Sequence, residues 1–358
     1  MTSDQVVPQQ PYKDPRRNFW GKSRSPPRNN RESPIGALVT LEQDGKNLEG
    51  TMSRHIWQRA MAVIVLLAGI AAAEPANRVT ILYDSFGKNP ALTMDWGFAA
   101  LIEYGGKRIL FDTGNNAQIL EHNVKAAGVD LQTLDFVVMS HRHGDHMGGL
   151  AYLLKVNPTV KIYAPKERSG VYGDDQPSSA WFRKEASLPT EQRYYSGAPP
   201  EIIHMGAAWP GANFQLIDRQ TEIVPGMFLI ALVSDKPGTQ EVHELSLAIR
   251  TPEGLVLVVG CSHPGVEQIV QQASAIDPHI HILLGGLHQI QASDPEVERI
   301  ADVLHNQYKL ERVAPGHCTG EPEFAALKRV FGDHYVYAGL GSVIDLADTR
   351  PAQTAGGE

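Results

Sequence analysis

The side chains with the clearest chemical potential in this sequence lie in one short run, His-Arg-His-Gly-Asp-His at residues 141–146. The run directly follows an apolar segment that is expected to form a buried strand. Because alternate side chains of an extended chain point the same way, His141 and His143 can reach one metal ion. Asp145 and His146 begin the next helix and can face a second ion a few ångströms away. The run therefore predicts a metal centre.

Three further histidines each follow an apolar, strand-like segment. They are His263 in Gly-Cys-Ser-His-Pro-Gly, His288 in Gly-Gly-Leu-His and His317 in Pro-Gly-His-Cys-Thr-Gly. Glycines beside them permit tight turns and a close approach of the backbone. Since ligands in α/β folds gather at the carboxyl ends of strands, these histidines are expected to join the first cluster. Two dications held there would lower the pKa of a shared water, which suits hydrolysis of an ester, lactone, amide or phosphoester.

The elements that must position these histidines alternate between strand and helix from residue 79 onward, which predicts one α/β domain over residues 79–346. The expected strands are 79–83, 98–104, 108–111, 135–140, 245–250, 255–259, 280–284, 312–314 and 335–338, and the expected helices are 116–127, 147–156, 266–275, 293–307 and 322–331. Asn115 is expected to cap the first helix. Ser293 and Glu296 are expected to form a capping box.

Residues 165–238 form a longer segment that is rich in Gly, Pro, Tyr and Trp, with strand-like pieces at 214–217 and 227–232. We expect an irregular insertion that covers the substrate. Its aromatic and basic side chains could clamp a flat heterocycle that carries phosphate; they are Trp181, Phe182, Tyr194, Tyr195, Trp209, Arg183, Lys184 and Arg193. The plainer interpretation, a small satellite core with solvated charges, is preferred, so substrate-binding residues are not assigned.

The N-terminal part of the chain differs in composition from the rest. Residues 1–51 are rich in Pro, Arg, Gln and Asn without apolar periodicity, which predicts a disordered extension, and residues 347–358 are interpreted as a disordered tail. Residues 52–73 combine a basic start, an apolar run and small residues, which is typical of a secretory signal peptide. The apolar run would span about 21 Å as a helix, too short for stable membrane insertion.

We therefore expect translation to begin at Met52 and the mature protein to be periplasmic or secreted. Anchoring to the membrane by an uncleaved signal is the alternative location. A buried core helix is the alternative interpretation of the apolar run.

Composition excludes several classes of protein. With 358 residues, of which 42% are hydrophobic, the chain is not disordered as a whole, and two cysteines cannot build a disulfide scaffold or a four-cysteine zinc module. A formal net charge of −8 argues against a nucleic-acid binder held by phosphate contacts. The expected partner is a small-molecule substrate, and the oligomeric state is not assigned.

The spacing His-x-His-x-Asp-His resembles the signature of the metallo-β-lactamase superfamily, and Phe-Asp-Thr-Gly at 111–114 resembles its first motif. The three loops around His263, His288 and His317 resemble the branch labelled 7,8-dihydropterin-6-yl-methyl-4-(β-D-ribofuranosyl)aminobenzene 5′-phosphate synthase. The resemblance implies an αββα sandwich with two metal ions, usually zinc, at one edge. It further implies that the first ion is held by His141, His143 and His263, and the second by Asp145, His146 and His317.

The sequence departs from the superfamily pattern at Cys261, where most members carry a bridging aspartate. Cys261 could bridge the ions as a thiolate, lie behind the ligands or leave the second site weak, and a thiolate would favour zinc over manganese. It could also form a disulfide with Cys318 in an oxidising compartment. His243 precedes another strand, where many members have a ligand, and so competes with His263, which is favoured.

Two residues are candidates for roles beside the metal ligands. Asp112 is expected to accept the free ring N–H of a ligand histidine, or else to be a turn residue. His288 is expected to hold the substrate or give a proton to the leaving group, or else to be structural. His288 and the ligand Asp145 are the two residues expected to act in catalysis.

The leading hypothesis is an exported metal-dependent hydrolase that uses a metal-bound hydroxide. One alternative is a transferase of the synthase type that the branch label describes, and another is a non-catalytic metal or ligand binder. Export conflicts with a cytosolic pterin pathway; because a family resemblance fixes chemistry better than substrate, the signal peptide is given more weight.

Overall fold

The computed structural model of the chain describes residues 77–167, 171–172, 185–201 and 209–346. The predicted N-terminal extension, signal peptide and C-terminal tail lie outside the described residues, as do Trp181, Phe182, Arg183 and Lys184. No helix within the described ranges is both long enough and apolar enough to span a lipid bilayer.

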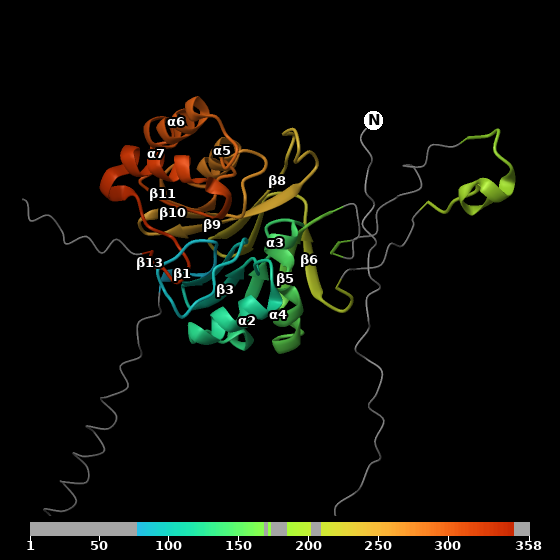
Figure 1. Cartoon of the computed structure of the whole chain (residues 1–358), viewed down its shortest axis with the longest axis horizontal. Helices are drawn as coiled ribbons and strands as arrows, with labels where there is room; N and C mark the ends of the chain where they lie inside the picture. The colour runs from blue at the N-terminus through green and yellow to red at the C-terminus, as the bar shows by residue number, and fades with distance from the viewer. Residues whose placement is uncertain (1–76, 168–170, 173–184, 202–208, 347–358) are drawn as a thin grey trace, which may run out of the picture. The chain divides into compact units, whose positions relative to one another are not determined.

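Two mixed β-sheets form the centre of the described domain (Figure 1). The strands of the first sheet are β1 (Arg78–Tyr83), β2 (Ala99–Tyr104), β3 (Lys107–Phe111), β4 (Phe136–Val138), β5 (Lys161–Pro165), β6 (Asn213–Ile217) and β13 (Val343–Asp345). Those of the second are β7 (Thr221–Val224), β8 (Met227–Val233), β9 (His243–Thr251), β10 (Gly254–Val259), β11 (Ile280–Gly286) and β12 (Arg312–Gly316). The strand orders are β13-β1-β2-β3-β4-β5-β6 and β12-β11-β10-β9-β8-β7.

Apolar side chains on both faces of the strands hold the sheets between two further layers. In β10 alternate residues Val256 and Val258 join the core between the sheets, while Leu255, Leu257 and Val259 pack on the helices outside. A strand that is buried on both faces needs an unbroken apolar run, which is why β10 does not alternate with polar residues.

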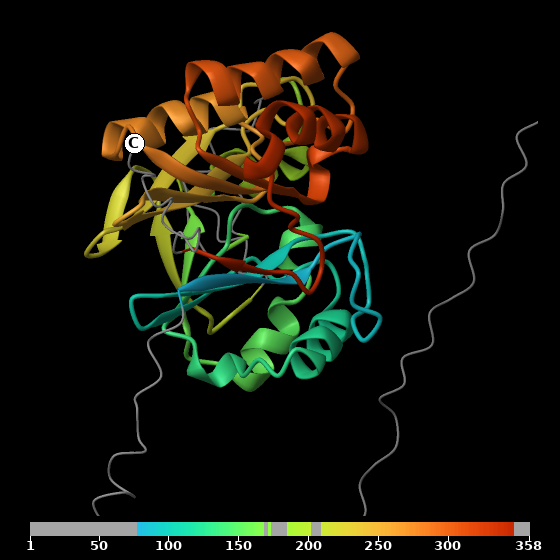
Figure 2. The same ribbon diagram turned by 90° about the vertical axis from the view of Figure 1, so that its left-hand side faces the viewer.

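Helices complete the sandwich on its two outer faces (Figure 2). The helices are α2 (Ala117–Ala126), α3 (Gly144–Met147), α4 (Leu150–Val156), α5 (Val266–Ile276), α6 (Asp294–Asp302) and α7 (Glu321–Phe331). Leu120 of α2 and Leu153 of α4 pack on the first sheet, whereas Ile269 of α5, Ile300 of α6 and Leu327 of α7 pack on the second. The domain is the αββα sandwich that the sequence predicted.

Parallel strand pairs bring the histidine loops to one edge of each sheet. In the first sheet β3, β4, β5 and β6 run parallel, and in the second β10, β11 and β12 do. Their carboxyl ends therefore meet at a common edge, which is where α/β folds place ligands. The loops at 112–116, 139–143, 260–265, 287–293 and 317–320 all leave from such ends.

Several boundaries differ from those that the sequence predicted. Helix α2 is capped by Asn116, not Asn115, and the Asn116 side chain accepts from the backbone N–H groups of Gln118 and Ile119. Ser293 does precede α6, but its side chain makes no capping hydrogen bond, so the capping box is not formed. The helical turn after α6 is a π-helix, Val303–Gln307.

The region 165–238, which was expected to be an irregular insertion, supplies β6, β7 and β8 to the two sheets. The predicted strand 335–338 is an isolated bridge between Tyr335 and Val313, and β13 is the edge strand instead. Trp209 packs against the core of the first sheet, while Tyr194 and Tyr195 are exposed. The substrate-covering role of this region stays a prediction.

Glu323 in α7 is fully buried, and neither of its carboxylate oxygens has a hydrogen-bond partner among the described residues. Burial, with repulsion from Glu298 and Glu296, raises the pKa of Glu323 from 4.5 to about 8. Below pH 4.5 Glu323 is protonated in both the folded and the unfolded chain, and its contribution to folding stability is complete. As the pH rises towards 8, the unfolded chain loses this proton while the folded chain keeps it, so the contribution of Glu323 to stability is lost.

We therefore expect Glu323→Gln to be more stable than the wild type at pH 8, by on the order of a few kcal/mol, with little difference near pH 4.5. Urea unfolding of both proteins across this pH range measures the effect. Glu321→Gln, in the same helical turn but exposed, is the matched control and should show no such trend. If the difference in free energy of unfolding between Glu323→Gln and the wild type did not change with pH, Glu323 would ionise as easily in the folded chain as in the unfolded one.

Candidate metal centre

Asp112, directly after β3, fixes the orientation of the first histidine loop. Its buried carboxylate accepts hydrogen bonds from the Ser140 backbone N, from Ser140 Oγ and from His146 Nδ1, each at 2.7 Å. Because Asp112 accepts this hydrogen bond, His146 carries a proton on Nδ1, and Nε2 is the ring atom left to bind a metal once it has lost its own proton. Asp112 therefore lies against the Nδ1 of a predicted ligand histidine, as expected from the sequence; its positioning role stays a prediction, and its backbone has a φ of 57°.

The same carboxylate sets His141 through the serine hydroxyl. Ser140 Oγ donates a hydrogen bond to Asp112 and lies 2.8 Å from His141 Nδ1. The hydroxyl oxygen therefore accepts a hydrogen bond from the Nδ1–H group of His141. His141 Nε2 is then a free donor atom, and it lies 3.1 Å from His143 Nδ1. Two nitrogen ligands of one tetrahedral zinc ion lie about 3.3 Å apart, so this spacing fits a shared ion.

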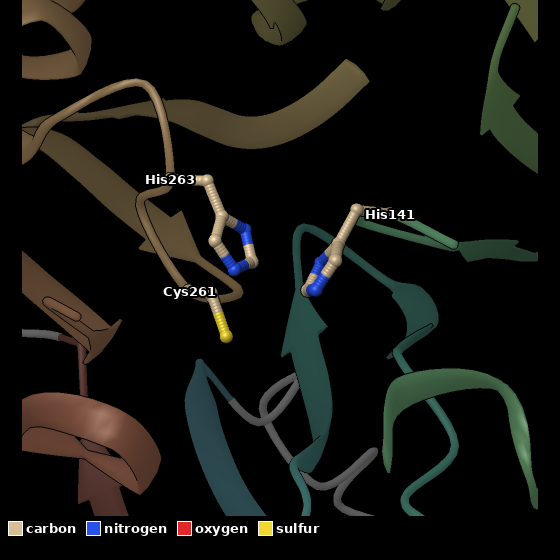
Figure 3. A group of neighbouring side chains, drawn as sticks. All are labelled: His141, Cys261 and His263. Carbon is tan, nitrogen blue, oxygen red and sulfur yellow. The ribbon is translucent and has the colours of Figure 1, made fainter. Parts of the chain in front are cut away.

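His263 and Cys261 reach the first group from the other sheet. Donor atoms of His141, Cys261 and His263 all lie within 4.8 Å of one another. Figure 3 shows the imidazole and the thiol, which come from the loop after β10, facing His141 from the loop after β4. The His143 ring completes the group, with its centroid 4.7 Å from those of both His141 and His263.

A second group lies beside the first and shares Cys261 with it. His146 Nε2 is 3.2 Å from both His317 Nε2 and Cys261 Sγ, and these three donors lie within 4.8 Å of one another. Asp145 Oδ2 lies 3.5 Å from His317 Nε2 and 3.9 Å from His146 Nε2. The structure thus brings together all the residues predicted as ligands, with the Cys261 sulfur common to both groups.

Burial and crowding oppose protonation of two of these imidazoles, His141 and His143. Burial and the neighbouring His146 lower the pKa of His141, and burial with His263 lowers that of His143 to about 4. Burial also lowers the pKa of His146, but Asp112 outweighs it and raises the value to about 9. Although burial opposes ionisation, the contact with His317 holds the pKa of Asp145 well below its usual range. The donor set suits a borderline cation such as zinc, because it combines imidazoles with a carboxylate and a thiol.

Glu244 in β9 is a functional residue that the sequence did not reveal. Its buried carboxylate accepts from the backbone N–H groups of Cys261, Ser262 and His263 at 3.0, 2.7 and 2.8 Å, and from His263 Nδ1 at 2.9 Å. Although burial opposes ionisation, the bonds with His263 keep the pKa of Glu244 below its usual value. This carboxylate leaves His263 Nε2 free to bind a metal.

His243, the competing candidate, lies at the start of β9 opposite Val233 and belongs to none of the donor groups within the described residues. The next residue, Glu244, explains why His263 and not His243 joins the donor groups, because its carboxylate binds the backbone and the ring of His263. The structure therefore brings His263, and not His243, to His141.

Asp84 is a second residue that was missed. It follows β1, is fully buried and accepts from the backbone N–H groups of His317 at 3.0 Å and Ser85 at 2.7 Å. Burial raises the pKa of Asp84 to about 7, against the opposing effect of His317. On the solvent side Trp96, which is 41% exposed, contacts the His317 ring with centroids 5.0 Å apart. A carboxylate directly after an apolar strand was the available sequence signal.

The two cysteines are both buried and free, with their sulfurs 3.3 Å apart, so the disulfide considered from the sequence is not formed. His288 lies beside them: its ring is 4.5 Å from that of His263, and a hydrogen bond with Cys318 raises the pKa of His288. His288 is exposed at the rim of the centre, unlike the buried ligands His141, His146, His263 and His317.

Comparison with known proteins agrees with this fold. The model of the metallo-beta-lactamase superfamily matches residues 97–317, and the chain belongs to that superfamily, whose members usually bind divalent metals. It is 28% identical over 286 residues to the 7,8-dihydropterin-6-methyl-4-(beta-D-ribofuranosyl)-aminobenzene-5'-phosphate synthase of Methanocaldococcus jannaschii, covering 71% of this chain and 91% of that protein. The predicted superfamily and branch resemblance is confirmed.

Two further similarities point to proteins named as hydrolases. The crystal structure of Tm1679, described as a metal-dependent hydrolase of the beta-lactamase superfamily, superposes with a TM-score of 0.56 at 27% identity, covering 76% of this chain and 99% of that chain. The hydroxyacylglutathione hydrolase of Aeromonas salmonicida is 33% identical over 86 residues, which is 23% of this chain and 32% of that protein.

Proposed function

We propose that this protein is a metal-dependent hydrolase with two divalent ions, preferably zinc, at the edge of the sandwich. The observation that carries the proposal is the convergence of two donor groups that share the Cys261 sulfur. His141, His143 and His263 would hold one ion, and Asp145, His146 and His317 the other, with Cys261 between them. When bound, such a pair lowers the pKa of water and polarises the bond that is attacked.

The protein's own contribution is to hold His141, His146 and His263 in one tautomer and one orientation. Asp112 accepts a hydrogen bond from the Nδ1–H group of His146, and Glu244 accepts one from the Nδ1–H group of His263. These partners raise the basicity of the ligating nitrogens and prevent the rings from turning. His141, His146, His263 and His317 are buried, and electrostatic effects there are stronger than in water.

His288 is placed to act on the substrate because it is exposed at the rim and its ring contacts that of His263. A proton donor at this position can reach a leaving group on a substrate that lies over the centre. We assign it that role or that of holding the substrate. Trp96, which contacts the His317 ring and is partly exposed, offers an apolar surface for a flat part of the same molecule.

A synthase-type transferase is the second candidate function, and the similarity to the Methanocaldococcus jannaschii synthase over most of both chains favours it. The similarity to Tm1679 over nearly all of that chain favours the hydrolase. A metal or ligand binder without turnover is the remaining possibility. For the location, we propose export by residues 52–73, and for the partner a small molecule rather than nucleic acid or membrane.

Removal of the metal is expected to abolish turnover, by more than about 100-fold, and zinc is expected to restore it. The purified chain would be assayed on esters, lactones and phosphoesters with water as the sole acceptor, and in parallel with a dihydropterin and an aminobenzene phosphate. Product formed in water alone supports the hydrolase, and product formed only with both substrates supports the transferase.

His143→Ala should behave like the chelated enzyme, whereas His305→Ala, beside Phe331 in the π-helical turn, should retain full activity. Metal bound at the centre without turnover on any of these compounds would leave only the non-catalytic binder.

A further inference from the structure

Two residues of the conspicuous sequence motifs are not used by the pair of ions proposed above. Cys318 follows the ligand His317, and His288 ends the loop after β11. Both lie beside the sulfur of Cys261, and the donor atoms of Cys261, His288 and Cys318 all lie within 4.8 Å of one another. The three residues form a group with the composition of a soft-metal site, two sulfurs and one imidazole.

The backbone holds this group in a costly conformation. Ser262, His288 and His317 all have positive φ, at 66°, 53° and 48°, although none of them is glycine. Each is adjacent to, or belongs to, the group that surrounds the sulfurs. Such conformations persist only where the surrounding structure enforces them, and they concentrate at functional sites. The surrounding structure therefore holds these three loops in place around the sulfurs.

The sulfur separation distinguishes between two uses of a cysteine pair. Two thiolates bound to one zinc ion lie about 3.7 Å apart, whereas a disulfide requires about 2.05 Å. The observed 3.3 Å is much closer to the first value. Both thiols are buried, at 3% and 2% exposure, which protects them from solvent oxidants and excludes competing water ligands.

We propose that Cys261, His288 and Cys318 form a further metal position, selective for a thiophilic ion such as Zn²⁺ or Cu⁺, adjoining the pair of ions. Cys261 belongs to all three donor groups, so its thiolate links the new position to the others. Cys318 and His288 are the ligands unique to this position. His288 closes it on the exposed side, where an ion can enter, and while it binds this ion it does not act as the proton donor proposed above.

The test is metal loading of the full chain, purified under reducing conditions and stripped of metal. Zinc is added, unbound metal is removed, and elemental analysis counts the ions per chain. The wild type is expected to hold about three ions and Cys318→Ala about two. Co²⁺ gives an independent readout, because each thiolate ligand adds charge-transfer absorption; Cys318→Ala is expected to lose about half of that band.

His288→Ala should weaken Cu⁺ binding, measured by competition with a chromophoric Cu⁺ chelator, and the surface variant His305→Ala should not. An ion count and a Co²⁺ band that Cys318→Ala leaves unchanged would overturn the proposal, because the sulfurs then form only a hydrogen-bonded thiol pair. Loss of two hydrogens in the mass of the unreduced protein would likewise overturn it in favour of a disulfide.

These outcomes are separable from those of the proposed function. If Cys318→Ala and the wild type both hold two ions and both turn over, the hydrolase stands and the further position does not exist. If the wild type holds one ion more than Cys318→Ala but neither shows turnover, the further position stands without the hydrolase.

Discussion

Replacing Asp112 by Asn is expected to lower zinc affinity by about 10- to 100-fold and hydrolysis by at least as much. The substitution keeps the size of the side chain but removes one acceptor. Asp112 accepts from both the backbone N and the hydroxyl of Ser140 and from His146 Nδ1, so an amide NH₂ group must face at least one of these donors. The arrangement can be satisfied only if His146 moves its proton to Nε2, the atom that must bind the metal.

Two measurements separate this tautomer effect from a loss of fold. Zinc competition gives the affinity, and nitrogen NMR of the imidazoles in the metal-free protein above pH 9, where His146 is neutral, shows which of its ring nitrogens is protonated. Asp135→Asn is the matched control, because Asp135 makes a surface ion pair with Lys107 that contributes less than about 1 kcal/mol. Unchanged zinc affinity in Asp112→Asn would show that Asp112 is only a turn residue.

The ligands could be predicted from the sequence because their spacing is local and their context is simple. His141, His143, Asp145 and His146 need only one strand end and one helix start, and an apolar run reveals the strand. His263 and His317 were predicted because parallel strands deliver their ends to one edge. Distance along the chain, such as the 171 residues between His146 and His317, does not obscure that rule.

Glu244 and Asp84 were missed because they bind backbone amides, and the sequence does not show which amides a carboxylate will bind. Glu244 binds backbone amides 17 to 19 positions away, and Asp84 binds the amide of His317, 233 positions away. Backbone amides have no sequence signature, so a buried carboxylate that holds them resembles any other acid. Edge strand β13 was missed for a related reason: three residues pair with β1 without an apolar pattern of their own.

Removal of the Glu244 carboxylate is expected to lower both the stability of the protein and its zinc affinity strongly, because this one side chain holds the whole loop that carries Cys261 and His263. Glu244→Ala leaves the amides of Cys261, Ser262 and His263 without their acceptor in a buried site. Each unsatisfied buried group costs about 1–3 kcal/mol, so we expect a loss of at least about 3 kcal/mol of stability together with zinc binding.

Glu244→Gln separates the two consequences. Oε1 accepts from Cys261 and Ser262, while Oε2 accepts both the amide and Nδ1 of His263. An amide NH₂ at the second position keeps the loop partly held but cannot accept from His263, so zinc affinity should fall more than stability does. Urea unfolding of the metal-free proteins and zinc competition measure the two quantities.

The adjoining His243 supplies the decisive control, because it is the residue that the sequence offered as an alternative ligand to His263. It lies in β9 outside the donor groups of the described residues, so His243→Ala should bind zinc as the wild type does. If His243→Ala lost zinc while Glu244→Gln kept it, His243 would be the ligand and the loop after β10 would serve another purpose. The opposite pattern is expected, since the Glu244 carboxylate lies within hydrogen-bond distance of His263 and fixes the ring nitrogen that faces His141.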